Sequence, residues 1–213
     1  MLQIIAIVTM FLDHLGVLFS VPVLRVVGRV SMPIYAYLLS VSVYKCSDLN
    51  KFTKRLFILG FISQIPYYIF IGDKRANIIF SWFFCAVLIY IYNSDYKKYI
   101  KVILYCFVAC CLFGGQKYDY GMIAVLWFLF FYIFFYKKKN SAFFILGIIL
   151  FLYIVFQSYI ELFSLISLPV IIICRKKHIE RIKNITFEKI YKYFYPAHLV
   201  FLDLFKVLAG SSA

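Results

Sequence analysis

The sequence predicts an all-α integral membrane protein, a polytopic bundle of about nine membrane-spanning helices. Of the 213 residues, 65% are hydrophobic and 22% are aromatic, and the mean hydropathy is +0.91. This composition is more apolar than one soluble core of this size requires. Apolar runs of roughly 15–22 residues recur along the whole chain, and runs of that length are typical of helical spans.

Basic residues separate the apolar runs and give the chain its net charge of +14. Four segments hold 17 of the 23 Lys and Arg residues: 45–55, 97–101, 137–139 and 175–192. Such clusters mark the cytoplasmic side of membrane proteins, and they can also attract an anionic cofactor or lipid headgroups. No nucleic-acid-binding module accompanies the charge, so we do not expect nucleic acid as a partner.

The basic segments also predict the number of spans. If each is cytoplasmic, every apolar block between two of them crosses the lipid bilayer twice, with breaks at 20–25, 72–75, 114–119 and 157–161. A last span, Tyr193 to Leu208, makes nine, with the amino terminus cytoplasmic and the carboxyl terminus outside. We expect residues 1–209 to form one multi-pass domain in a bacterial cytoplasmic (inner) membrane, and we treat residues 210–213 as an added tail. No cleaved signal peptide is expected, because apolar residues follow Met1 at once.

The six cysteines do not suggest a disulfide framework. Cys106, Cys110 and Cys111 fall on neighbouring helical positions, but no histidine lies near them in the sequence. We therefore expect small buried hydrophobic residues and no metal site.

The strongest candidate site lies at membrane depth in the first two spans. Asp13 and His14 are adjacent in the first apolar run, and Arg29 lies within the second. Ionisable groups at that depth cost about 2.5–3.5 kcal/mol on insertion scales, so they usually face a partner or a wet cavity. His14 is suited to accept a proton from a reacting group, or it bridges two helices. Arg29 either neutralises Asp13 in an ion pair or serves as a cation that stabilises an oxyanion.

Further polar residues are candidates for binding a substrate or cofactor. Gln64 places an amide in mid-span, while Asn77 and Asp119 open predicted helices, where each is equally suited to be a helix cap. Tyr193 and His198 lie in the last span, where pairings of Asp203 with Lys206 or with His198 are both open.

Six stretches of the sequence carry a resemblance to a known family. They are LQIIAIVTMFLDHLG, RVVGRVSMPIYAYLL, RLFILGFISQIPYYIF, NIIFS, YDYGMIAVLWF and YKYFYPAHLVFL. In order and position they resemble the TraX family, integral membrane proteins associated with conjugal pilin acetylation. That family is similar in turn to bacterial O-acyltransferases and to the lysosomal heparan N-acetyltransferase, which use a cytoplasmic acyl-CoA donor and a first-span histidine.

The resemblance implies that an acetyl group passes from acetyl-CoA to an amine or hydroxyl of a surface or secreted acceptor, such as a pilin, peptide or glycan. His14 would act as general base or as transient acetyl carrier, Asp13 and Asp119 would orient the imidazole or bind the acceptor, and Arg29 or Asn77 would stabilise the oxyanion. No metal is implied.

One position departs from the family. Relatives commonly carry Lys or Arg eleven residues before the histidine, and here that residue is Gln3. It lies about 16 Å from His14 along a helix, on nearly the same face. Gln3 can donate a hydrogen bond to a CoA phosphate but adds no charge, so the basic loops would have to supply it.

Two non-enzymatic functions are also open on the sequence. The buried charges would form a relay in a small transporter, or would lock helix packing in a pilus or secretion assembly factor.

Overall fold

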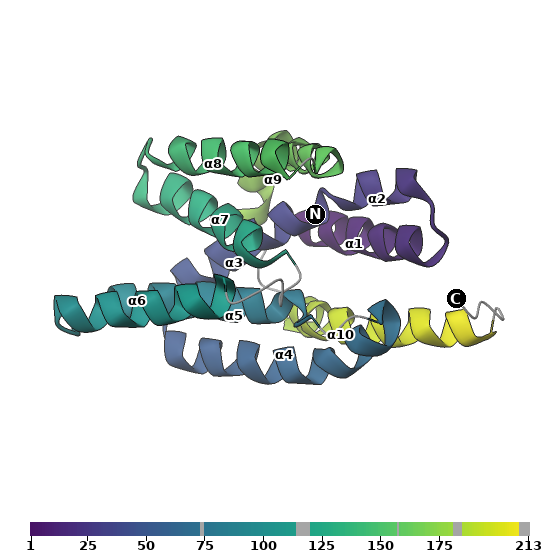
Figure 1. The fold of residues 1–213 in the computed structure, drawn as a ribbon, viewed down its shortest axis with the longest axis horizontal. Coiled ribbons are helices and arrows are strands. Elements are labelled where there is room, and N and C mark those ends of the chain that lie inside the picture. Colours follow the sequence, from purple (N-terminus) through teal and green to yellow (C-terminus); the bar gives the residue numbers. More distant parts are fainter. Residues whose placement is uncertain (73–74, 114–119, 157, 181–184, 209–213) are drawn as a thin grey trace. The chain divides into compact units, whose positions relative to one another are not determined.

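The computed structural model describes residues 1–72, 75–113, 120–156, 158–180 and 185–208, and only the backbone of residues 112–113, 175–180 and 185–192. The described part of the chain is 87% helix and contains no strand (Figure 1). The prediction of an all-α protein is therefore confirmed.

The helices belong to two compact units. Unit 1 (Met1–Leu38 and Gly147–Ala213) contains α1 (Leu2–Leu18), α2 (Pro22–Gly28), the first part of α3 (Ser31–Lys45), most of α8 (Ala142–Val155), the 3₁₀ helix η2 (Tyr159–Ile166), α9 (Ser167–Glu180) and α10 (Ile185–Leu208). Unit 2 (Leu39–Leu146) contains the rest of α3, α4 (Leu49–Ile71), α5 (Ile78–Asn93), α6 (Lys98–Phe113), α7 (Gly121–Tyr132) and the π-helical turn η1 (Ile133–Lys137). The single domain expected for residues 1–209 stays a prediction.

Helix ends agree with the predicted breaks, but most helices are shorter than a membrane span. Among the described residues only Pro22–Lys45, with 24 residues and a mean hydropathy of 1.4, is long and apolar enough to cross a membrane. Five shorter apolar helices have 10–17 residues. At 1.5 Å per residue, a helix of about 16 residues extends about 24 Å, whereas the hydrocarbon core is about 30 Å thick. The bundle of nine spans therefore stays a prediction.

A left-handed residue, with a proline two positions later, fixes the turn between α1 and α2. Ser20 has a φ of 54°, the Val21 N–H donates to the Gly16 carbonyl at 3.0 Å, and the Ser20 N–H donates to the Val17 carbonyl at 3.4 Å. These two bonds form a Schellman motif, which satisfies carbonyls at the end of α1. Pro22 then begins α2, where no N–H donor is needed. As a result α1 and α2 lie side by side (Figure 1).

Glycine allows the two helices to approach closely at Asp13. A Cβ atom on Gly28 would overlap the Asp13 Cβ and lie 2.6 Å from the Asp13 Cα. A Cβ on Gly16 would lie 2.9 Å from the backbone nitrogen of Arg25. Real Cβ atoms do not approach heavy atoms so closely, and the packing of α1 on α2 therefore requires glycine at both positions.

Gly28→Ala is expected to push α2 away from α1 and to destabilise unit 1 by about 1–3 kcal/mol, the usual cost of overpacking. Gly147→Ala is the matched control, because a Cβ on Gly147 in α8 meets nothing within 4 Å and alanine is favoured in a helix by about 0.5–1 kcal/mol. Thermal unfolding of micelle-embedded protein, followed by circular dichroism, should show a lower Tm for Gly28→Ala alone. Equal midpoints for the two variants would contradict the close packing.

Pro33, in the first turn of α3, accounts for the interruption between α2 and α3. In a continuous helix residue 33 would donate its N–H to the Arg29 carbonyl, and proline has no N–H. The α-helical pattern stops at Gly28 and resumes at Ser31, which agrees with the freed carbonyl expected there, and the kink of the second span stays a prediction. Arg29 lies at this interruption.

An apolar stripe on α4 is exposed. Ile58, Ile62, Ile65 and Ile69 recur at helical spacing, and each is more than half exposed. Contiguous apolar faces of this kind are uncommon on soluble monomers and favour contact with lipid.

The cysteines are only partly buried. Cys85 and Cys174 are buried as predicted, but Cys106 and Cys110 are exposed, so the prediction of a buried position is wrong for these two. On α6 they share a helical face with the exposed Ile103 and Phe107. A thiol is small and weakly polar, and it suits such an apolar surface as well as a core.

Candidate functional site

Five ionisable side chains meet inside unit 1. Asp13 and His14 come from α1, Arg29 from the end of α2, Glu161 from η2 and His198 from α10. Four of them are between 4% and 9% exposed, and the Glu161 side chain is 21% exposed. Buried charge at this density is costly unless the groups satisfy one another.

Arg29 joins two carboxylates. Its Nη2 lies 2.6 Å from Asp13 Oδ1, and its Nη1 lies 2.7 Å from Glu161 Oε1. A third donor, Nε–H, bonds to the Arg25 carbonyl at 3.3 Å. The ion pair between Asp13 and Arg29 was one of the two interpretations of these residues, and it is confirmed. Short charge-assisted bonds of this kind are about twice as strong as neutral ones, which offsets the burial of Arg29.

Glu161 is the member of this cluster that was not predicted from the sequence. From the sequence, residues 157–161 were predicted only to form a break between two spans. The second oxygen of this carboxylate, Oε2, is buried without a hydrogen-bond partner in the described part of the chain. A carboxylate within the apolar stretch around residues 151–173 meets the same criterion that singled out Asp13, and that signal would have found it.

His14 and His198 are hydrogen-bonded to each other. His14 Nδ1 lies 2.8 Å from His198 Nε2, and His198 Nδ1 lies 2.7 Å from the Phe194 carbonyl oxygen. A carbonyl only accepts, so His198 Nδ1 carries the proton that is donated to Phe194. In a neutral ring His198 Nε2 is then the acceptor, and His14 Nδ1–H is the donor. The lone pair of neutral His14 therefore lies on Nε2.

The ring of Phe194 packs against the histidine pair. The ring centroids of His14 and His198 are 4.9 Å apart, and the ring of Phe194 stacks on His198 at 4.9 Å with an interplanar angle of 6°. Both members of the pair were predicted site residues, but the sequence left open a pairing of His198 with Asp203 instead. The structure gives His198 the partners His14 and Phe194.

The remaining predicted residues of unit 1 lie on the same helices as the histidines. Gln3 is half-buried on α1, and Tyr193 is exposed on α10. Asp119 lies outside the described residues.

Gln64 and Asn77 bind each other in unit 2. The Asn77 side-chain N–H groups donate to the Gly60 carbonyl at 2.8 Å and to Gln64 Oε1 at 2.9 Å, and Asn77 Oδ1 accepts from the Ile79 N–H at 3.0 Å. Gln64 Nε2 donates to the Arg75 carbonyl at 2.9 Å. Both side-chain N–H donors of Asn77 are thus used. This geometry favours the helix-cap interpretation of Asn77 over oxyanion binding.

Comparison with known proteins gives one result. Neither the curated proteins nor the solved structures contain a significant match to this chain. Residues 1–206, which include every member of the buried cluster, match the family model described as TraX protein, and the chain therefore belongs to the TraX family.

Proposed function

We propose that this protein is a membrane-embedded acetyltransferase that moves an acetyl group from cytoplasmic acetyl-CoA to an amine or hydroxyl of a surface or secreted acceptor. The observation that supports this most is the hydrogen-bonded order Phe194 carbonyl, His198, His14, since it gives one buried imidazole a defined basic nitrogen. A structural histidine needs no such second imidazole to set its tautomer.

The chemistry follows from that tautomer. His14 Nε2 takes the proton of the acceptor N–H or O–H as the acceptor attacks the thioester carbonyl. The tetrahedral intermediate then expels the CoA thiolate, which takes the proton back from His14. In the alternative order His14 Nε2 attacks the thioester itself and expels the CoA thiolate. The acceptor then attacks the acetyl-imidazolium, its proton passes to the thiolate, and neutral His14 is released.

The Arg29 cluster supports this site through charge. Asp13 lies on α1 directly before His14, and its carboxylate is held by the ion pair with Arg29. Arg29 is the cation that we propose for the developing oxyanion, with Asp13 and Glu161 holding the guanidinium in one orientation.

Family membership supports a conjugation-related role, and we propose pilin as the acceptor. The exposed isoleucines of α4 and the apolar composition support a position in the inner membrane. An enzyme embedded in that membrane would have access both to a cytoplasmic donor and to an acceptor that crosses or leaves the membrane.

Purified protein in liposomes is expected to transfer label from acetyl-labelled acetyl-CoA to pilin or to a short peptide with an unmodified amino terminus. Mass spectrometry of the acceptor should show the added acetyl group, and omission of the protein is the control. If the acceptor stays unlabelled but a solute crosses the liposome membrane, the result would favour a transporter. Normal pilus assembly with no acetylated product would favour the assembly factor.

A further inference from the structure

A cavity of about 640 Å³ lies within unit 2, where several of its helices end. The lining comes from the end of α3, the start of α4, the end of α5 and the end of α7. All of the lining residues belong to this unit. The volume falls within the range of about 300–1,000 Å³ that is usual for small-molecule sites.

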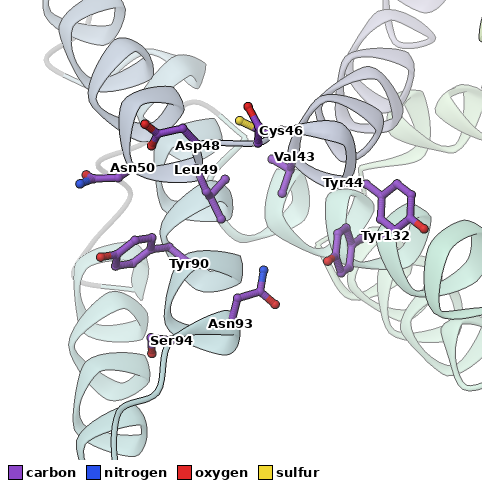
Figure 2. A pocket seen from close by; sticks show the side chains of 11 residues that line it. Val43, Tyr44, Cys46, Asp48, Leu49, Asn50, Tyr90, Asn93, Ser94 and Tyr132 are labelled. Carbon is purple, nitrogen blue, oxygen red and sulfur yellow. The ribbon is translucent and has the colours of Figure 1, made fainter.

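Amide and hydroxyl side chains form part of the lining. Figure 2 shows the Asn93 amide pointing into the space below Val43 and Leu49. Asn93 and the lining residue Ser47 are both exposed, so a ligand can reach them. These groups donate hydrogen bonds to phosphate oxygens and accept them from hydroxyls. The cavity therefore suits a headgroup that combines a phosphate with hydroxyls.

Two lysine ammonium groups lie beside the cavity. Lys137 Nζ is 6.0 Å from the ring centroid of the lining residue Tyr132. Lys101 Nζ donates to the Tyr92 carbonyl at 3.0 Å, and that carbonyl is joined to the backbone nitrogen of the lining residue Asn93. The positive-inside rule requires only that lysines lie on one side of a membrane. Here tertiary contacts bring lysines from two basic segments to the same cavity.

Asp48 is the acidic residue of the lining, and its charge is already engaged. Its Oδ1 accepts from the Lys51 N–H at 2.9 Å, and its Oδ2 lies 3.3 Å from Lys51 Nζ. The Lys51 N–H beside Asp48 lowers the pKa of that carboxyl below its usual value. Residues 45–55, 95–101 and 137–139 together hold ten Lys and Arg and two acidic residues. The surroundings of the cavity are therefore positive and attract an anion.

An apolar track on α4 leads away from the cavity. Phe57 and Phe61 follow the lining residue Asn50 by seven and eleven residues. They therefore lie within about 20° of its helical face, about 10 and 16 Å further along the axis. They are 43% and 57% exposed, and the Phe61 ring packs edge-on against Phe80 of α5 at 5.2 Å. Exposed apolar surface of this kind suits an acyl chain, and a soluble phosphate compound does not cover it.

We propose that this cavity binds the headgroup of an anionic phospholipid, with the phosphate beside Lys101 and Lys137 and an acyl chain along Phe57 and Phe61. Basic pockets between helices at the cytoplasmic side of a membrane bind such headgroups. A soluble phosphate compound would share the phosphate, and the apolar track favours the lipid. The site needs neither acetyl transfer nor a contact with unit 1.

The headgroup is tested by titration of the full-length protein in detergent micelles with phosphatidylglycerol, while native mass spectrometry counts the retained lipids. One phosphatidylglycerol should be retained at concentrations at which phosphatidylethanolamine is not. Lys137→Gln should weaken retention about fivefold, because a lysine near an anionic lipid contributes about 1 kcal/mol. Lys139→Gln is the matched control, since it removes the same charge from the same exposed segment and should leave the Kd unchanged. Lys137→Arg keeps the charge and should keep the lipid.

The acyl chain is tested separately. Phe61→Ala should weaken retention, whereas Phe144→Ala, which removes an exposed ring of α8 in unit 2, should not. Glycerol 3-phosphate has the phosphate without the chains, and an excess of it should not displace the lipid.

Three outcomes would overturn the proposal. Equal weakening by Lys137→Gln and Lys139→Gln would show that the lipid is attracted by the basic surface as a whole. Equal retention of phosphatidylglycerol and phosphatidylethanolamine would show that the cavity does not select an anion. Displacement by glycerol 3-phosphate, with no effect of Phe61→Ala, would assign the cavity to a soluble phosphate compound.

Discussion

His14→Ala is expected to reduce kcat for acetyl transfer about 10²–10⁴-fold, the usual contribution of a general acid–base group. The protein should still accumulate in the membrane, because the ion pairs of Arg29 do not involve the imidazole. Initial rates with labelled acetyl-CoA, normalised to the amount of protein in the membrane fraction, measure the effect. His178→Ala is the matched control, since His178 lies in a basic segment of the sequence and not in an apolar run.

The partner histidine separates positioning from packing. His198→Ala removes the acceptor of His14 Nδ1–H, so the ring loses its fixed tautomer, and kcat should fall while KM is retained. His198→Gln offers an amide oxygen as a new acceptor and should recover part of kcat. Equal rates for His198→Ala and the wild type would make the contact a packing feature only. Full turnover by His14→Ala would remove His14 from the mechanism.

Local features of this fold could be predicted from the sequence because they depend on neighbouring residues. Pro33 removes a donor four residues after Arg29, and the break between α2 and α3 follows from that spacing alone. Asp13 and Arg29 lie on consecutive helices that are joined by a single short turn. Their pairing was therefore one of the few choices open to two buried charges. Charge was a poorer guide to the helix ends, because α9 continues to Glu180 and α10 begins at Ile185, inside the basic segment 175–192 and before the predicted start of the last span at Tyr193.

Long-range partners could not be predicted in this way. His14 and His198 are 184 residues apart, and Arg29 and Glu161 are 132 residues apart, so no spacing rule joins them. Both histidines were identified as site residues, but which nitrogen faces which partner depends on tertiary packing. Gln64 and Asn77 show the reverse case. Their polarity in an apolar stretch suggested a ligand site, but the structure bonds the two side chains to each other and bonds Gln64 to the Arg75 carbonyl between α4 and α5.

Arg29→Ala is expected to destabilise unit 1 by about 3–5 kcal/mol, because it leaves two buried carboxylates without a counter-charge. Arg29→Lys should recover only part of this loss. An ammonium is a compact charge without the planar fork that reaches Asp13 at 2.6 Å and Glu161 at 2.7 Å together. Arg55→Ala is the matched control, since Arg55 is exposed on α4 and should change stability by less than about 0.5 kcal/mol. Unfolding midpoints in mixed micelles measure each variant.

Removal of all three charges tests what the cluster is for. In the variant Arg29→Met, Asp13→Asn, Glu161→Gln no buried charge is left uncompensated, so stability should return to within about 1–2 kcal/mol of the wild type. A structural cluster would then also regain acetyl transfer, because the helices are again held together. A cluster whose charge stabilises the oxyanion would regain the fold without kcat, and that second result is the one we expect. Recovery of both would reduce Arg29 to an interhelical contact and leave His14 and His198 as the reactive part of the site.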